Sequence, residues 1–210
     1  MNGMSTDIRR YRLKARAERQ RKTRERIVAA TAALHQKVGP ARTTIADVAR
    51  RAGVQRLTVY NNFPELGDLL AACQGHFLAA SPPPDITPGV PAERAPVRLE
   101  AALADLYGWY RKNEAMQRNI NRDRHLVPEL DQLLRLSADA RFDAAASDFA
   151  RLIGGGAKAA SAVRPLVRLA LDFGTWQRLA GEGLSDRAMA RLMQRAVASI
   201  TPANQLRSQQ

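Results

Sequence analysis

Apolar residues recur every three or four positions along most of the chain, which is the spacing of an amphipathic helix. One stripe begins at Ile27 and stops at Gly39-Pro40, and a second covers Ile45 to Ala52 and stops at Gly53. No segment shows the strict alternation of apolar and polar residues that is typical of a half-buried strand. The pattern predicts an all-α protein.

A proline-rich segment divides this helical pattern. The segment from Ser81 to Pro91 contains five prolines. Because proline lacks a backbone N–H and fixes φ, no helix is expected to cross this stretch. The expected divisions are an arm (1–23), a small helical domain (24–80), a linker (81–92), a larger helical domain (93–202) and a tail (203–210).

Positive charge is concentrated at the start of the chain, whose formal net charge is +13. Eight of the fourteen residues from 9 to 22 are basic, namely Arg9, Arg10, Arg12, Lys14, Arg16, Arg19, Arg21 and Lys22. Such an arm raises the local concentration of polyanions, of which nucleic acid is the foremost. A solvated basic tail without a specific partner is the alternative.

The shape of the arm has two alternatives. It offers few apolar residues to bury, chiefly Ile8, Tyr11 and Leu13, and this composition favours disorder in the absence of DNA, which we expect. The competing picture is a helical extension of the first helix, because Ala15, Ala17 and Glu18 are good helix formers.

The segment from Thr43 to Phe63 has the pattern of two short helices joined by a tight turn. Gly53 can adopt the positive φ that such a turn requires, and Ala49 and Ala52 are small enough for the helices to cross closely. This is the geometry of a helix-turn-helix, whose second helix enters the major groove of DNA. An ordinary pair of short helices with a polar surface is the alternative.

Helical phase separates two faces of the second short helix. Val59 and Phe63 lie one turn apart and are expected to point inward. The outward positions are Arg56, Leu57, Tyr60 and Asn61, with Thr58 at the edge. Most of these side chains are donors and acceptors suited to base edges and phosphates, so this face is the expected DNA-reading surface.

These motifs resemble the DNA-binding domain of the TetR family of transcriptional regulators. The resemblance covers residues 24–73 and rests on the helix start Thr43-Thr44-Ile45, the turn Ala52-Gly53-Val54 and the run Thr58-Val59-Tyr60-Asn61-Asn62-Phe63. Residues 171–179 and 183–186 also resemble the end of many family members. The resemblance implies a three-helix DNA-binding domain followed by a larger helical domain for ligand binding and dimerisation.

The resemblance also implies which side chains contact DNA. They are Thr43, Thr44, Arg56, Leu57, Thr58, Tyr60, Asn61 and Asn62. Two cationic contacts that are common in the family are missing, because Ala46 and Leu66 stand at their positions, and Leu57 replaces a small residue. We expect the basic arm to supply phosphate contacts instead.

In the TetR family the last two helices form a dimer interface, and here two apolar helices are expected over about 161–180 and 186–200. The implied interface residues are Leu166, Leu169, Ala170, Phe173, Trp176, Leu192, Met193 and Val197. Burial in the core of a single chain is the alternative for each of them. A twofold dimer would present two recognition helices to a palindromic operator.

The family places a small-molecule pocket among the middle helices, where the candidates are Tyr107, Tyr110, Arg111 and Met116. Aromatic side chains with a polar tip are common in pockets, but they are also common in cores. Arg111 and the basic residues after it would favour an anionic ligand, unless they only cover a solvated helix face. The expected effector is an unidentified small molecule.

Other functions are disfavoured by missing motifs. The chain has no glycine-rich phosphate loop, nucleophile elbow or His-Glu-x-x-His motif, so no catalytic residue is expected. A single cysteine, Cys73, excludes an intramolecular disulfide, and three separated histidines give no metal-ligand spacing. There is no apolar run long enough to span a membrane and no secretory signal, so a cytoplasmic location is expected.

The expected function is that of a transcriptional regulator, a repressor that a small molecule releases from a palindromic operator. It would act on double-stranded DNA as a homodimer and without a cofactor. An architectural or ligand-independent DNA-binding protein is the alternative, and an enzyme is less favoured. A purely architectural role would not need the large C-terminal domain.

Overall fold

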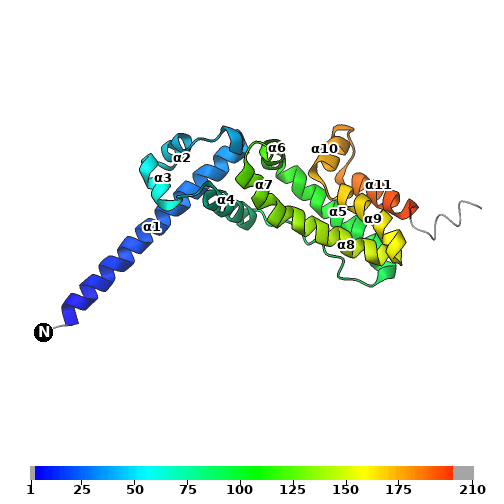
Figure 1. Cartoon of the computed structure of the whole chain (residues 1–210), viewed down its shortest axis with the longest axis horizontal. Helices are drawn as coiled ribbons and strands as arrows, with labels where there is room; N and C mark the ends of the chain where they lie inside the picture. Colours follow the sequence, from blue (N-terminus) through cyan, green and yellow to red (C-terminus); the bar gives the residue numbers. More distant parts are fainter. Residues whose placement is uncertain (1–2, 201–210) are drawn as a thin grey trace, which may run out of the picture.

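The computed structural model describes residues 3–200, with side chains from residue 10 onward, and every regular element in this part of the chain is helical. The helices are α1 (Gly3–Lys37), α2 (Ile45–Ala52), α3 (Arg56–Asn62), α4 (Leu66–Ala80), α5 (Ala95–Lys112), α6 (Glu114–Asp123), α7 (Pro128–Leu134), α8 (Ala140–Gly154), α9 (Ala157–Ala170), α10 (Phe173–Gly181) and α11 (Asp186–Ser199). The prediction of an all-α protein is confirmed. Figure 1 shows α1–α4 at one end of an elongated molecule and α5–α11 at the other.

The small domain packs α2, α3 and α4 against the C-terminal half of α1. Its core is formed by Ile27, Val28, Ala30, Val48, Ala49, Ala52, Val59, Phe63 and Leu69. Between α2 and α3, Gly53 takes the left-handed conformation with φ 63°, and its N–H donates to the carbonyls of Ala49 and Arg50. The tight turn therefore has the backbone geometry that the sequence predicts.

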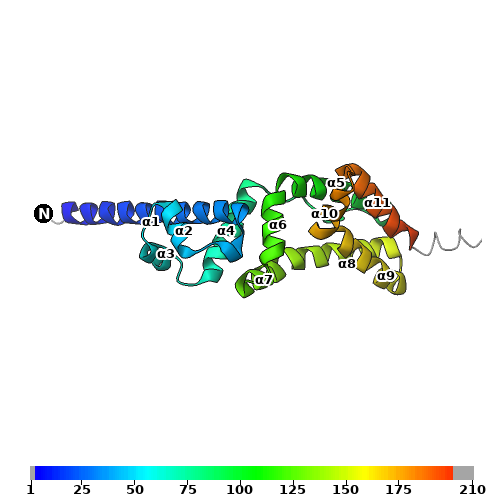
Figure 2. The ribbon, with the colours of Figure 1, turned by 90° about the horizontal axis from the view of Figure 1, so that it is seen from above.

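The described part of the arm is helical, because α1 runs without interruption from Gly3 to Lys37. Its exposed turns are joined by ion pairs from Arg21 to Glu18 at 2.6 Å and to Glu25 at 2.5 Å, and such pairs stabilise a helix. The expectation of a disordered arm is thus corrected in favour of the helical extension. Figures 1 and 2 show this part of α1 projecting beyond α2, α3 and α4. Residues 1–2 of the arm and the tail at 203–210 lie outside the described residues.

The large domain encloses a second core between α5, α8, α9, α10 and α11. Its fully buried side chains include Leu99, Leu103, Phe149, Trp176 and Met189. A short π-helical segment, Arg135–Asp139, joins α7 to α8. Figure 2 shows α6 crossing from α5 toward α7 at the end of this domain that faces the small domain.

The proline-rich linker packs against the large domain. Ile86 is fully buried in the core of that domain. Two guanidinium groups fasten the linker backbone: Arg98 donates to the Asp85 carbonyl at 2.8 Å, and Arg141 donates to the Pro84 carbonyl. The segment is therefore a wall of the large domain as well as a connection.

The single helix expected over 161–180 is wrong, because the structure has two helices there. α9 ends at Ala170, and α10 begins at Phe173. Asp172 has an extended backbone and caps α10, since its carboxylate accepts a hydrogen bond from the Gly174 N–H at 2.8 Å. The apolar positions on the two sides of this break consequently belong to two different helices.

Candidate DNA-binding surface and ligand pocket

The helix-turn-helix begins with a threonine that caps α2. The Thr44 hydroxyl oxygen accepts a hydrogen bond from the Asp47 N–H at 3.1 Å, and the hydroxyl donates to the Asp47 carboxylate at 2.6 Å. The half-buried Thr43 donates to the Gly39 carbonyl at 2.8 Å. Thr44 is the exposed member of the pair, so a phosphate could reach it, in competition with Asp47 for the hydroxyl proton.

The outer face of α3 is polar and lacks internal partners. The exposed side chains are Arg56, Leu57, Tyr60 and Asn61, of which Leu57 is 65% exposed and Tyr60 52% exposed. Within the described chain, no hydrogen bond or ion pair engages Arg56, Tyr60 or Asn61 through its side chain. Val59 and Phe63 are buried, so the face that was expected to point inward does so.

The two other α3 candidates lie at the edge of this face. Thr58 and Asn62 are both half-buried. The Asn62 side-chain amide donates to the Thr58 carbonyl at 2.7 Å. Asn62 is therefore anchored to its own helix, whereas Tyr60 and Asn61 point their polar groups to the surface.

Two arginines of α1 hold the helix-turn-helix in place. Arg24 donates to the Asn62 carbonyl at 2.5 Å, and its guanidinium lies 3.8 Å from the centre of the Phe63 ring. Arg26 donates to the carbonyls of Ala52 and Gly53 at 3.1 and 2.9 Å. The C-terminal ends of α2 and α3 are thus both fixed to α1. Both arginines lie in the segment from residue 24 that resembles the start of the TetR domain, but nothing in their spacing indicates this positioning role.

The arm presents exposed cations along the N-terminal half of α1. The exposed ones are Arg10, Arg12, Lys14, Arg16, Arg19, Arg21 and Lys22, while the side chain of Arg9 lies outside the described residues. Glu18 pairs with both Arg21 and Lys22 and partly offsets their charge. Among the described side chains the other five arm cations form no ion pair, so their charge is available to an external polyanion.

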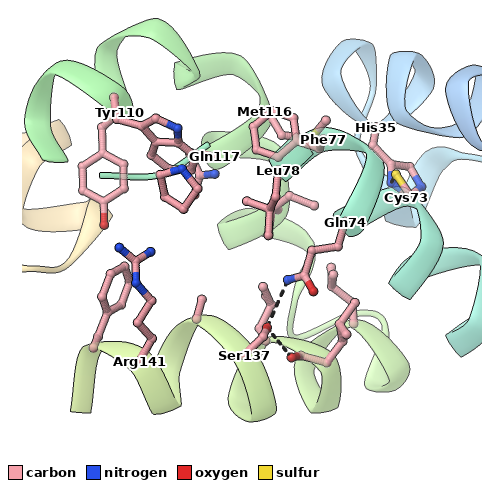
Figure 3. Close-up of a pocket in the computed structure, with 18 of the residues that line it drawn as sticks. His35, Cys73, Gln74, Phe77, Leu78, Tyr110, Met116, Gln117, Ser137 and Arg141 are labelled. Atoms are coloured by element: carbon pink, nitrogen blue, oxygen red, sulfur yellow. Dashed lines mark hydrogen bonds between the residues drawn. The ribbon is translucent and has the colours of Figure 1, made fainter. Parts of the chain in front are cut away.

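A cavity of about 520 Å³ lies in the large domain where it meets α4. Side chains of α4, α5, α6, α7 and α8 and of the linker line it, as Figure 3 shows for part of its wall. Tyr110 and Met116, two of the four residues expected in the pocket, lie in this wall. The size and the mainly apolar lining are those of a small-molecule site.

The other two expected pocket residues, Tyr107 and Arg111, do not line the cavity. Tyr107 is fully buried in the large core, where its hydroxyl donates to the Ala170 carbonyl at 2.7 Å. Arg111 lies at the surface in a two-pronged ion pair with Asp186, with both contacts at 2.9 Å. The cavity-facing positions of α5 are Leu106, Trp109 and Tyr110, and the helical turn sends 107 and 111 to a neighbouring face.

Polar groups in the cavity come mostly from residues that the sequence did not single out. Gln74 of α4 donates to the Ser137 hydroxyl at 3.0 Å, and Gln117 and Arg141 also line the wall. Figure 3 shows Arg141 and Tyr110 at one end of the cavity and His35 and Cys73 at the other. These residues are separated by up to 106 positions in sequence, so no local motif could have grouped them.

His35 and Cys73 form a buried contact at that far end. The Cys73 sulfur lies 3.5 Å from His35 Nδ1. Burial lowers the pKa of His35 to about 4 and raises the pKa of Cys73 to about 12. Both groups are therefore neutral at pH 7, and His35 also lines a second cavity of about 490 Å³ between the two domains.

Helix α6 fastens the large domain to the end of α1. The Asn119 side-chain amide donates to the carbonyls of His35 and Gln36, each at 2.9 Å. The buried Asp123 carboxylate accepts from the Ala41 N–H at 3.1 Å and from Arg122 at 2.7 Å. Burial alone would raise the pKa of Asp123, but these hydrogen bonds outweigh it and lower the pKa. One face of α6 therefore binds the end of α1 at the junction between the two domains, and another face lines the cavity.

Most of the residues expected at a dimer interface are core residues of this chain. Ala170, Phe173, Trp176, Met193 and Val197 are buried, and the Phe173 and Trp176 rings lie 5.3 Å apart. The break before α10 turns this aromatic pair inward. Leu166 is half-buried, and Leu169 and Leu192 are 52% and 47% exposed, so only these three of the eight offer apolar surface.

Two kinds of feature are absent from residues 3–200. No helix there is both long and apolar enough to cross a membrane. No group of three or more His, Cys, Asp and Glu side chains is placed to hold a metal ion in the same part of the chain.

Comparisons with known proteins point to one family. Residues 27–73 match the family model of bacterial regulatory proteins, tetR family. A TetR-like transcriptional regulator from Rhodococcus sp. RHA1 has the same fold, with a TM-score of 0.60 and 16% identity over 84% of this chain and 94% of that one. A TetR transcriptional regulator from the same organism is 23% identical over 87% of this chain and 97% of that one, with a TM-score of 0.44. No curated protein matches this sequence.

Proposed function

We propose that this chain, whose residues 27–73 match the family model of bacterial regulatory proteins, tetR family, is a transcriptional repressor that binds a palindromic operator as a homodimer. A small molecule in the 520 Å³ cavity would release it. The observation that carries the proposal is the outer face of α3, where Arg56, Tyr60 and Asn61 are exposed and lack partners in the described chain. Such side chains suit hydrogen bonds to base edges in the major groove.

The helical arm would add phosphate contacts to this recognition. Ala46 and Leu66 provide no cation where related domains carry one, whereas α1 projects seven exposed cations beyond the helix-turn-helix. Contacts from lysine and arginine to phosphates raise affinity without selecting a sequence. The arm would therefore strengthen binding, and α3 would supply specificity.

A homodimer would use the apolar surface of Leu169, Leu192 and Leu166. These leucines lie on α9 and α11, which are adjacent helices at the end of the large domain remote from α3 (Figure 1). A twofold axis there would leave both recognition helices free to meet two half-sites.

Release by an effector would act through α6. Met116, Gln117 and Ile120 of this helix line the cavity, and Asn119 and Asp123 of the same helix bind the end of α1. A ligand that displaces α6 would therefore displace the small domain, and with it the distance between the two recognition helices. Ligand binding can release DNA in this way only if the ligand binds the displaced arrangement of α6 with a different affinity from the arrangement that fits DNA.

Selection from a random pool of double-stranded DNA, followed by sequencing, tests the proposal. We expect enrichment of a pseudo-palindrome, with half-sites about one helical turn or more apart. Binding without enrichment would favour an architectural DNA-binding role, to which the basic arm is well suited. No binding at all would contradict both.

A further inference from the structure

One end of the cavity holds a cation that makes no ion pair within the described chain. Arg141 of α8 is half-buried in the wall and faces the hydroxyl end of Tyr110 (Figure 3). Within the described chain it donates one hydrogen bond, to the Pro84 carbonyl, and makes no ion pair. A guanidinium has five N–H donors, so most of those of Arg141 have no protein acceptor.

The nearest carboxylate is already occupied. Asp85 also lines the cavity, but it accepts hydrogen bonds from the backbone N–H and the hydroxyl of Thr87 at 2.9 and 2.8 Å. These bonds lower the pKa of Asp85, and Arg98 pairs with its carboxylate at 3.7 Å. Asp85 also attracts Arg141 electrostatically, but its carboxylate is mostly exposed and pairs with Arg98. Arg141 therefore presents a positive charge without an ion pair at this end.

The rest of the cavity is mainly apolar, and two of its polar side chains, Gln74 and Ser137, hydrogen-bond to each other. Its wall includes Phe77, Leu78, Leu106, Met116, Ile120 and Leu133. At the far end His35 and Cys73 are neutral at pH 7, since burial holds the pKa of His35 at about 4 and that of Cys73 at about 12. A ligand with a hydrocarbon body and one negative end would therefore match both parts of the wall.

We propose that the cavity binds an apolar carboxylic acid, with its carboxylate on the Arg141 guanidinium and its hydrocarbon body extending toward Cys73. One cation matches a monoanion better than a doubly charged phosphate, and the fork of an arginine suits the two oxygens of a carboxylate. This proposal rests on the proposed function only in treating the cavity as the effector site. Binding to the free protein does not depend on DNA.

Calorimetric titration of the full chain with linear carboxylates, from hexanoate to tetradecanoate, tests the proposal against the alcohols of equal length. We expect at least one acid to bind about tenfold or more tightly than its alcohol, because the carboxylate adds charge-assisted hydrogen bonds. Arg141→Gln removes the positive charge and keeps a polar side chain at this position. It should reduce acid affinity to the level of the alcohol and leave alcohol affinity within about twofold.

Arg151→Gln is the matched control, because Arg151 lies on the same helix and is exposed outside the cavity. It should leave both affinities unchanged, and circular dichroism should show that both variants are folded. Equal affinity for acid and alcohol, an equal loss of both in Arg141→Gln, or no binding by any acid of the series would overturn the proposal.

DNA binding by the same preparations separates the two proposals. A protein that selects an operator but binds no carboxylic acid would disprove the ligand class alone. A protein that binds the acid through Arg141 but selects no operator would retain the ligand class and remove the proposed function.

Discussion

Arginine side chains occupy three different environments in this chain, which differ in the partners that each side chain has. Arg24 and Arg26 are satisfied by backbone carbonyls and position the helix-turn-helix. Arg56 is exposed without a partner in the described chain, so it is available to DNA. Arg141 turns into a cavity and is available to a ligand. Composition alone counts all four arginines as positive charge and does not distinguish these environments.

Arg56→Ala tests base recognition by α3. If Arg56 makes a bidentate base contact, the change should weaken operator binding by about 1–3 kcal/mol and weaken binding to random DNA much less. Fluorescence anisotropy with both DNAs measures the difference, and Arg151→Ala serves as a remote control. Equal losses on the two DNAs would make Arg56 a phosphate contact instead.

Gly39→Ala should destabilise the junction between the domains. Gly39 has φ 94° and ψ 160°, a region that only glycine adopts readily, and a Cβ there would meet the Asp123 carboxylate. We expect a loss of about 1–3 kcal/mol in the free energy of unfolding, measured by urea denaturation. Gly75→Ala is the control, since Gly75 lies exposed inside α4 with open space around it and alanine should stabilise that helix slightly.

His35 makes the stability of the protein depend on pH. Its pKa falls from 6.5 to about 4 on folding, because burial disfavours the charged ring. Between these two pH values the unfolded chain binds the proton and the folded chain does not. The free energy of unfolding should therefore fall as the pH is lowered from about 6.5 to about 4, by up to about 3 kcal/mol from this group.

His35→Gln isolates this effect, because glutamine does not titrate. The difference in stability between the variant and the natural chain should change across that pH range and stay constant above about pH 7. A constant difference throughout would show that His35 does not titrate as its burial predicts.

At the scale of elements, α1 is the most unusual helix of the chain. Its C-terminal half packs in the core of the small domain, and its N-terminal half is exposed and cationic. The sequence predicted the basic charge but favoured disorder, because few apolar residues were available to bury. Helix-forming residues and the Glu18–Arg21–Glu25 ion pairs act locally, and they support the helix without burial.

Deleting residues 1–22 should weaken binding to operator and random DNA alike, because neutralisation of phosphates carries no sequence information. The slope of log K against log salt should flatten by about 0.9 for each phosphate that the shortened protein no longer neutralises. Titrations at several salt concentrations measure both effects. Unchanged affinity together with an unchanged slope would leave the arm as a solubilising segment.

The sequence predicts an element well when the residues that determine it lie close together along the chain. The turn at Gly53 and the inward pair Val59 and Phe63 follow from residues close together, and the sequence placed them correctly. The cavity does not follow in this way, because Arg141 meets Tyr110 only through the packing of α8 against α5. The helix break at Asp172 was missed because one capping carboxylate interrupts an otherwise continuous apolar pattern.

At the scale of the whole molecule, the proposed homodimer is expected to rest on the exposed Leu169 and Leu192 of the large domain. A homodimer should have twice the 23.1 kDa mass of the chain in mass photometry. Leu169→Glu combined with Leu192→Glu should give a folded monomer, because both side chains are already at the surface of the single chain. Phe173→Asp should instead unfold the large domain, since Phe173 is buried in its core. A double variant that remains dimeric would place the interface elsewhere.

Because α1 is straight (Figure 2) and continuous from the arm to the cavity wall, a rotation about a pivot near His35 would carry the whole helix with it. At 1.5 Å per residue, Arg24 lies about 17 Å from this pivot and Arg10 about 38 Å from it. A tilt of about 5° would therefore move the helix axis by about 1.5 Å beside the helix-turn-helix and by about 3 Å at the arm. The outermost described cations of the arm would therefore move farthest in any rotation that begins at the pocket.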